Sequence, residues 1–496
     1  MKTYTARMPH IVNVVVLVAA VLVAAVTGMA APFSPWVTVV AGGLAALTMV
    51  FSIGPKTVSV FFALLSILLV GYAVQGRGFA YLGISPLYVG ELVLILGIAA
   101  LTLGRARSRV SSVHLLLVSF MILGLLRTAQ YVPQYGFLAI RDAALWYYGA
   151  FAIVLSLLLT ESAIRRGVAL YATLLPYVVI WLPVMSIGFR LLDISLPRFP
   201  GSPLPIISLM KSGDQGVVLA GLAAFILSGL YVQHKSRFSI PSAIFWSLWA
   251  VAAVLVATGN RGGMLAIVMA LSVIALLRPS RDLLKATILG TGLLMTLFLI
   301  DPQIEFGGSR EFSARQLATN VVSIFSDETG AQGSVQSTKN WRLDWWSEIY
   351  GYTIKGDYFW TGKGFGVNLA DDDGFQVLGD SSLRSPHNGH MSVLARMGVP
   401  GIATWIALHS LFAWQVLRGY RRSIRMRDKY WSAFFLWILS YWAAIMTEAT
   451  FDVYLESPQG GIWLWCVLGM GIAGLRVHNE KWADHIGTSL GRAELP

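Results

Sequence analysis

Residues 242–278 read SAIFWSLWAVAAVLVATGNRGGMLAIVMALSVIALLR, and this stretch decides the fold. Two apolar runs, 242–259 and 262–278, are separated only by Asn260-Arg261. Each run is about as long as the 17 to 25 residues that a helix needs to cross the hydrocarbon core of a membrane. The stretch therefore predicts two membrane-spanning helices joined by a tight turn.

The whole chain shares this apolar character. Of its 496 residues, 56% are hydrophobic and 12% are charged, and the mean hydropathy is +0.66. Soluble domains carry roughly a quarter charged residues, so a soluble enzyme is excluded. The formal net charge of +12 does not indicate nucleic acid as a partner, because the Lys and Arg residues lie in short loops between apolar runs. A single cysteine, Cys466, excludes an intramolecular disulfide and a Cys-based metal site.

Hydropathy predicts an all-α polytopic membrane protein with about fourteen transmembrane helices. The expected spans are 11–29, 36–51, 57–74, 87–104, 113–126, 142–160, 168–188, 214–233, 242–259, 262–278, 286–300, 397–417, 430–447 and 460–476. The first run is longer than the apolar core of a signal peptide, about 7 to 15 residues, so we expect an uncleaved anchor. The expected organisation is a membrane bundle with spans 1 to 11 over 1–300, an outer loop over 301–390, spans 12 to 14 over 391–476 and a cytoplasmic tail over 477–496.

Basic loops set the expected orientation. With a cytoplasmic N-terminus and alternating spans, the densest basic clusters, such as Arg105/Arg107/Arg109 and the run from Arg418 to Lys429, all fall on the cytoplasmic side. The C-terminus is then cytoplasmic too. By the same parity the long polar stretch from Asp301 to His390 faces outward, into the periplasm if the membrane is the bacterial inner membrane.

Part of this outer loop has the periodicity of a helix. Trp341, Trp345 and Ile349 follow one another at i, i+4 and i+8, which makes one apolar stripe suited to the headgroup layer of a membrane. Arg342 lies on another face, with Trp346 one turn later. It either points toward a cavity or is a solvated surface arginine.

Histidines on the outer side are the candidates for acid–base chemistry. Of the eight, only His387 and His390 fall at the outer mouth of a span, the twelfth. Neutral imidazole accepts a proton near neutral pH, so His387 is a candidate general base. The alternative is that it caps or orients the helix start together with Asn388. A metal pair of His387 and His390 is disfavoured, because no metalloprotease-like or EF-hand spacing accompanies it.

Arg261 lies between two apolar runs, where charge is costly and needs a reason. One reason is an anion ligand, since the following glycines let a phosphate approach backbone N–H groups. The other is an arginine that snorkels from a tight turn.

Further polar residues lie at the expected outer ends of spans. Arg141-Asp142 opens the sixth span, and Glu91 is embedded in the fourth. Both can be purely structural: the first as an internal salt bridge, and Glu91 as a hydrogen-bonding contact to a neighbouring helix. Arg198 and Lys211 precede the eighth span and line either a polar groove or the surface.

Five short motifs follow one another in this order along the chain. They are Arg261-Gly262, Arg342 with Trp346 four residues later, Gly362-Lys-Gly-Phe-Gly366, His387-Asn388 and Gly398-Val-Pro-Gly401. This order resembles the O-antigen ligase/polymerase family, whose members join saccharides carried on undecaprenyl diphosphate at the outer face of the bacterial inner membrane. The resemblance covers about residues 190–476. Arg396 departs from it, since family members often have an acidic residue two positions before the Gly-x-x-Gly.

The resemblance implies a GT-C-like membrane glycosyltransferase that inverts the anomeric carbon. His387 would be the general base, and Arg261 and Arg342 would stabilise the diphosphate, with no nucleotide sugar, other cofactor or metal required. The remaining polar residues of the outer face are expected to bind substrate: Arg141, Arg198, Lys211, Arg384, Asn388 and His390.

The product is open between two reactions. We favour polymerisation of lipid-linked repeat units into O-antigen or exopolysaccharide over ligation to a lipid A core. The expected partners are an undecaprenyl-diphosphate-linked donor and acceptor, the bilayer, a chain-length regulator and a flippase. A flippase or other transporter is the competing class, but the chain shows no internal repeat, and a long polar outer loop is unusual for one.

Overall fold

A computed structural model describes most of the chain from residue 56 onward. It covers residues 56–84, 87–103, 110–191, 210–233, 240–279, 281–300, 333–377 and 381–493, with short pieces at 304–305, 311–312, 317–318 and 379. The expected spans 11–29 and 36–51, and the expected substrate residue Arg198, lie outside the described residues.

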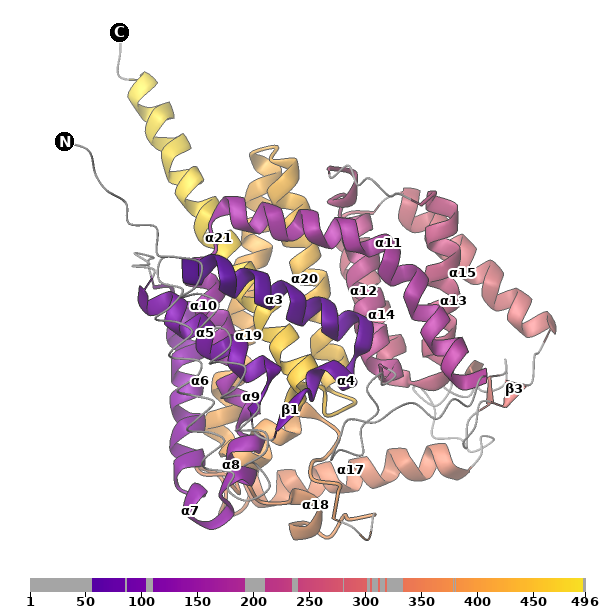
Figure 1. The fold of residues 1–496 in the computed structure, drawn as a ribbon, viewed down its shortest axis with the longest axis vertical. Coiled ribbons are helices and arrows are strands. Elements are labelled where there is room, and N and C mark those ends of the chain that lie inside the picture. Colours follow the sequence, from indigo (N-terminus) through magenta and orange to yellow (C-terminus); the bar gives the residue numbers. More distant parts are fainter. Residues whose placement is uncertain are drawn as a thin grey trace, which may run out of the picture.

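The described part is almost entirely helical (Figure 1). The longer helices are α3 (Thr57–Gln75), α5 (Val89–Leu103), α6 (Ser112–Ala129), α10 (Gly149–Leu158), α11 (Glu161–Leu191), α12 (Ser212–Leu227), α13 (Ser242–Gly259), α14 (Arg261–Leu277), α15 (Arg281–Ile300), α17 (Gly333–Ile354), α19 (Gly389–Arg425), α20 (Lys429–Ala449) and α21 (Pro458–Ala493). Short helices connect them: α4 (Arg77–Ala80), α7 (Val132–Tyr135), α8 (Phe137–Asp142), α9 (Ala144–Tyr147), α18 (Leu369–Asp372), η2 (Tyr231–Gln233) and η3 (Tyr454–Glu456). Two antiparallel strand pairs complete the list: β1 (Gly83–Ile84) with β2 (Leu87–Tyr88), and β3 (Ile304–Glu305) with β4 (Glu311–Phe312).

Several helices are long and apolar enough to cross a membrane. Among the described residues there are seven, or eight if the pair Phe137–Tyr147 and Gly149–Leu158, bent by 42°, forms one span. Three further apolar helices, α5, α12 and α14, are shorter. At 1.5 Å per residue they fall short of the roughly 30 Å of a hydrocarbon core. The chain is therefore a multi-pass helical membrane protein, but fourteen spans are not confirmed.

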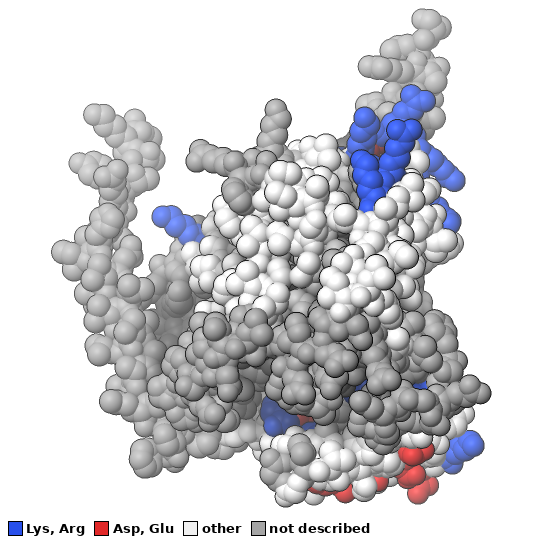
Figure 2. Space-filling model, turned by 90° about the vertical axis from the view of Figure 1, so that its right-hand side faces the viewer, with Lys and Arg blue, Asp and Glu red and all other residues white. Residues whose placement is uncertain are grey.

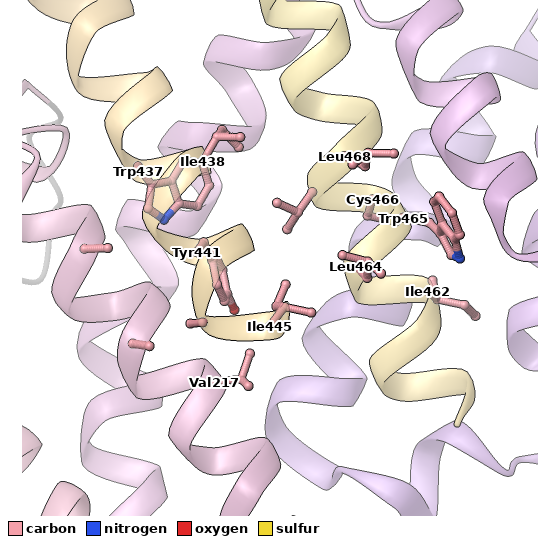
Figure 3. Close-up of a cluster of buried hydrophobic side chains, with 14 of the residues drawn as sticks. Val217, Trp437, Ile438, Tyr441, Ile445, Ile462, Leu464, Trp465, Cys466 and Leu468 are labelled. Atoms are coloured by element: carbon pink, nitrogen blue, oxygen red, sulfur yellow. The ribbon is translucent and has the colours of Figure 1, made fainter. Parts of the chain in front are cut away.

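Helix α20 lies at the centre of the bundle and packs against α12, α14, α19 and α21. Figure 3 shows the aromatic and aliphatic side chains between these helices, with Trp437 and Tyr441 on α20 and Trp465 on α21. Helices α12 and α14 approach closely where Gly216 meets Gly263, since a Cβ on Gly216 would lie 2.5 Å from the Cα of Gly263. Small residues at a contact allow this close backbone packing, which holds helices together in lipid.

Helix α17 lies across one end of the bundle (Figure 1). Trp345 and Ile349 are fully buried against Leu394 and Ala395 of α19 and the segment that includes Leu369. The helix was correctly expected from its periodicity. Its tryptophan stripe was expected to face the headgroup layer, and this was wrong for Trp345, because the stripe finds an apolar partner in α19.

Helix α19 begins earlier than the expected span 397–417 and is kinked. Gly398 has a φ of +64°, and Pro400 lacks the N–H of a helical turn. The carbonyls freed by the kink are bonded by the glycine-rich loop: Lys363 N donates to Ala395 O at 2.7 Å and Gly364 N to Arg396 O at 3.1 Å. The Gly-x-Gly and Gly-x-x-Gly motifs therefore form one clamp between loop and helix.

Charged residues separate along the molecule. Figure 2 shows the densest group of Lys and Arg at the upper end, and Asp and Glu at the opposite end. The connection between α19 and α20 is basic together with the helix ends that flank it, and Arg421, Arg425, Arg427 and Lys429 in this region are exposed. The asymmetry agrees in sense with the expected orientation, which stays a prediction.

Candidate active site

A short turn after α20 brings together residues that are far apart in the sequence. Asp452 lies in this turn, between α20 and η3, and only 10% of its side chain is exposed. His387 Nδ1 lies 3.2 Å from Asp452 Oδ1, and Lys211 Nζ lies 2.9 Å from Asp452 Oδ2. The carbonyl of the preceding residue, Phe451, accepts a hydrogen bond from Arg342 Nη1 at 3.0 Å. The turn therefore links α12, α17 and the start of α19.

His387 is held by its backbone and by the helix that it precedes. It has a φ of +50°, which is unusual for a non-glycine residue and costs of order 1 kcal/mol. Trp346 of α17 fixes the turn by donating to Pro386 O at 2.9 Å. Asn388 caps α19, since its side chain accepts from the N–H groups of His390 and Met391. The capping role that was the alternative for His387 thus belongs to Asn388, and the imidazole is left for Asp452.

The charge of Asp452 sets the tautomer of His387. Burial alone would raise the pKa of Asp452, but the hydrogen bond from His387 and the charge of Lys211 outweigh it and hold that pKa well below its ordinary value. An ionised carboxylate only accepts hydrogen bonds, so Nδ1 of His387 carries the proton. In the neutral ring, Nε2 is then the nitrogen that carries the lone pair.

One arginine contacts the same turn, and another begins a helix that packs against it. Arg342 reaches Phe451 from α17, and Arg261 is the first residue of α14. The residue after Arg261, Gly262, lies against the turn, because a Cβ there would lie 2.8 Å from Phe451 Cβ. The structure thus brings His387 and Arg342 to one turn and places the backbone that carries Arg261 next to it.

Glu448 is a buried carboxyl beneath this turn. It has no exposed surface, and neither carboxylate oxygen has a hydrogen-bond partner among the described residues. It lies between the first turns of α12 and α14, since a Cβ would meet its oxygens at 1.8 Å from Gly213 and at 2.6 Å from Gly262. Only glycine leaves room for the carboxyl at both positions.

Sequence reasoning missed both Glu448 and Asp452. A signal was present, because the two carboxyls follow an apolar span at i and i+4 on its expected outer end. Ionisable residues in such positions are functional candidates by default.

The other expected substrate residues are mostly engaged with protein. Asp142 binds Arg384 at 3.0 Å, Arg396 at 3.2 Å and Arg141 at 3.4 Å. Arg396 has no exposed surface, and it also donates to the carbonyls of Gly364 and Val367. Its departure from the family pattern is therefore explained by a charge partner on another helix, since a buried charge needs one.

His390 lies deeper than His387. Its Nδ1 accepts from the indole N–H of Trp405 at 3.1 Å, and its Nε2 donates to Met446 O at 3.1 Å. Both ring nitrogens are used by the bundle, which gives the residue a packing role in this structure. No group of three or more His, Cys, Asp or Glu side chains that could hold a metal ion occurs in the part of the chain that the structure describes.

A cavity of about 370 Å³ opens beside His387 and Lys211. From there it extends along η3 to a group of tyrosines on β2, α9 and their neighbours. Arg141 and Arg384 also line it. The cavity gives the imidazole a space in which a substrate can be held.

A comparison with curated proteins finds no match for the chain. Residues 246–406 match the family model described as O-antigen ligase. The matched region runs from α13 into α19 and includes Arg261, Arg342 and His387. Residues 246–406 are therefore similar to the O-antigen ligase family, and this match supports membership of the O-antigen ligase/polymerase family.

Proposed function

We propose that the chain is an inverting glycosyltransferase that polymerises undecaprenyl-diphosphate-linked repeat units into O-antigen or exopolysaccharide. The observation that carries the proposal is the turn at Phe451 and Asp452, which is bonded to His387 and to Arg342 and lies against the first turn of α14, the helix that begins at Arg261. That arrangement suits transfer of a sugar from a diphosphate to a hydroxyl.

His387 acts as the general base in this mechanism. Its Nδ1–H is bonded to Asp452, so Nε2 takes the proton of the acceptor hydroxyl as the oxygen attacks the anomeric carbon. Asp452 orients the ring and stabilises the imidazolium that forms, in the manner of other His–Asp pairs. Attack from the face opposite the diphosphate inverts the anomeric carbon.

Arg261 and Arg342 stabilise the leaving group. The bond from the anomeric carbon to the diphosphate oxygen breaks, and the oxygen keeps the electron pair. Guanidinium groups hold phosphate oxygens bidentately, and each such donor typically contributes a few kcal/mol to the transition state. The leaving group therefore needs charge stabilisation rather than a proton, and no metal or nucleotide is part of the mechanism.

The test is glycan transfer by the purified protein in lipid nanodiscs, supplied with lipid-diphosphate-linked oligosaccharide. His387→Ala should lower the rate by about 10²–10⁴-fold. Arg261→Lys and Arg342→Lys should each lower it strongly, because a lysine cannot form the planar bidentate contact. Arg425→Lys, an exposed arginine at the other end of α19, is the matched control. Normal transfer by His387→Ala would overturn the proposal, and retention of the anomeric configuration would overturn the mechanism.

Ligation to a lipid A core is the second candidate, and the description of the matched family as O-antigen ligase favours it. The two reactions leave different products when the chain is inactivated in its host. Loss of a polymerase leaves single repeat units on the lipid, whereas loss of a ligase leaves long polymer unattached to lipid A.

We further propose that the site faces the periplasm of the bacterial inner membrane, with both termini in the cytoplasm. The basic connection between α19 and α20 lies at the opposite end from α17 and supports this orientation. Residues 301–390 then form the periplasmic loop between bundle segments 1–300 and 391–476, followed by a cytoplasmic tail at 477–496. Cysteine labelling from either side, at Lys355→Cys in the loop and Arg425→Cys at the basic end, tests the orientation in a Cys466→Ser background.

A further inference from the structure

His387 lines the cavity, and the two arginines do not. Among the described residues, Lys211 shares this lining with His387, whereas neither Arg261 nor Arg342 belongs to it. The imidazole therefore borders a space that neither guanidinium group lines. A transfer reaction needs two substrates to meet at its base.

Tyrosine rings form the far wall of the cavity. Tyr81 and Tyr88 meet edge to face, with centroids 5.2 Å apart, and Tyr147 and Tyr148 meet with centroids 4.8 Å apart. The Tyr147 hydroxyl donates to Glu91 Oε1 at 2.9 Å, and Tyr148 donates to the same oxygen. These hydrogen bonds fix the rings of Tyr147 and Tyr148 before a ligand binds. An apolar face of a ligand can therefore pack on them without the cost of ordering these side chains.

Carboxylate oxygens supply the acceptors in the cavity. Glu91 Oε2 already takes the backbone N–H of Tyr88 at 3.0 Å. Glu456 Oε1 is buried and has no hydrogen-bond partner in the described part of the chain. A buried acceptor without a partner is destabilising, and a ligand hydroxyl would remove that penalty.

The basic side chains that line the cavity already have carboxylate partners, and Arg141 and Arg384 share theirs with the buried Arg396. Arg141 and Arg384 bind Asp142, and Lys211 binds Asp452. A diphosphate would have to compete with these ion pairs, whereas a hydroxyl-rich ligand with apolar ring faces would not. Ordered aromatic rings with an unpaired acceptor oxygen fit the latter chemistry.

We propose that this cavity binds the acceptor saccharide and presents one of its hydroxyls to Nε2 of His387, while the diphosphate of the donor lies on the arginine side. The inference rests on the proposed function for the identity of the reaction. It assigns Tyr81, Tyr88 and Glu456 to acceptor recognition, and it gives Glu91 a positioning role through the hydroxyls of Tyr147 and Tyr148.

The test separates binding from transfer. The probe is the oligosaccharide repeat unit released from its lipid by mild acid, and its binding to the purified protein in nanodiscs is measured by calorimetry. Tyr81→Ala and Glu456→Gln should each weaken this binding about tenfold and raise the KM for the acceptor, with the KM for the donor unchanged. Tyr350→Ala, an exposed tyrosine on α17, is the matched control and should change neither value. Each variant is first checked for an unchanged melting temperature.

The outcomes also separate this inference from the proposed function. His387→Ala should lower transfer by about 10²–10⁴-fold and still bind the free saccharide, because the tyrosines and Glu456 that line the cavity are unchanged. If the wild type transfers no sugar but the saccharide binds and Tyr81→Ala weakens it, the proposed function fails and the saccharide site stands. If the saccharide does not bind, or if donor and acceptor KM values rise together in Tyr81→Ala and Glu456→Gln, the acceptor assignment is overturned.

Discussion

Replacing Asp452 by asparagine tests how the site orients His387. The change keeps the shape of the side chain and removes its charge. Lys211 donates to both carboxylate oxygens, and Oδ1 also bonds His387 and takes the N–H of Val453. An asparagine has one acceptor oxygen for the three donors. When its NH₂ group faces His387, Nδ1 must accept, and Nε2 becomes the protonated nitrogen that cannot act as a base.

The magnitude follows from the geometry. Opposite unit charges at the 3.2 Å between Nδ1 and Oδ1 interact by about 5 kcal/mol at an effective dielectric of 20. Lys211 cancels part of this stabilisation of the imidazolium, and solvent screens more, because 28% of the His387 side chain is exposed. General-base catalysis contributes about 10²–10⁴-fold in total. We therefore expect Asp452→Asn to lower kcat by about 10²–10³-fold, with little change in the KM for the donor.

The assay is initial-rate transfer in nanodiscs with both substrates varied. Asp428→Asn is the matched control, because Asp428 caps the other end of α20 and asparagine caps a helix equally well. Retention of at least half of the wild-type kcat by Asp452→Asn would show that Asp452 does not orient the base. A loss of the same size in Asp428→Asn would attribute the effect to α20 as a whole.

Two further predictions concern buried groups that hold the site in place. Gly213→Ala puts a Cβ 1.8 Å from Glu448 Oε1 and should lower the free energy of unfolding by about 1–3 kcal/mol or more. Gly167→Ala is the matched control, because no atom lies within 4 Å of its added Cβ, and it should be neutral or slightly stabilising. Thermal unfolding in detergent compares the two variants. Asp142→Ala leaves the fully buried Arg396 without its carboxylate and should cost about 3–5 kcal/mol, and a melting temperature equal to that of the wild type would refute the structural role of the pair.

Hydropathy predicted the helices well wherever one apolar run makes one straight helix. The expected span 242–259 coincides with α13, Ser242–Gly259, and every expected span from residue 57 onward overlaps a helix. The run 142–160 was expected as one span, but the structure bends it between α9 and α10. A window average measures apolar content and does not detect such bends. It also placed the start of α19 too late, because the polar first turn of that helix is capped by Asn388 and covered by α17 rather than by lipid.

The site could be predicted only in part. Topology selected His387 and His390, and the motif order selected Arg261 and Arg342, but nothing local indicates which polar residue is already paired. Arg384 resembles a substrate ligand in the sequence, and in the structure Asp142 holds it. Its partner Asp142 lies 242 residues earlier in the sequence, on helix α8. Such pairing is decided by tertiary packing, which composition and spacing do not report.

The turn after α20 explains why the separate motifs of the chain work together. The carbonyl of Phe451 accepts a hydrogen bond from Arg342, and the carboxylate of Asp452 binds His387 and Lys211. One short segment therefore contacts both an arginine of the proposed donor site and two residues that line the proposed acceptor cavity. Glu448, which precedes this segment, packs against Gly213 of α12 and Gly262 of α14. In the proposed mechanism, the carboxylate that orients His387 comes from a turn outside the matched residues 246–406. The proposal therefore makes the C-terminal helices part of the catalytic unit and not merely a membrane anchor for it.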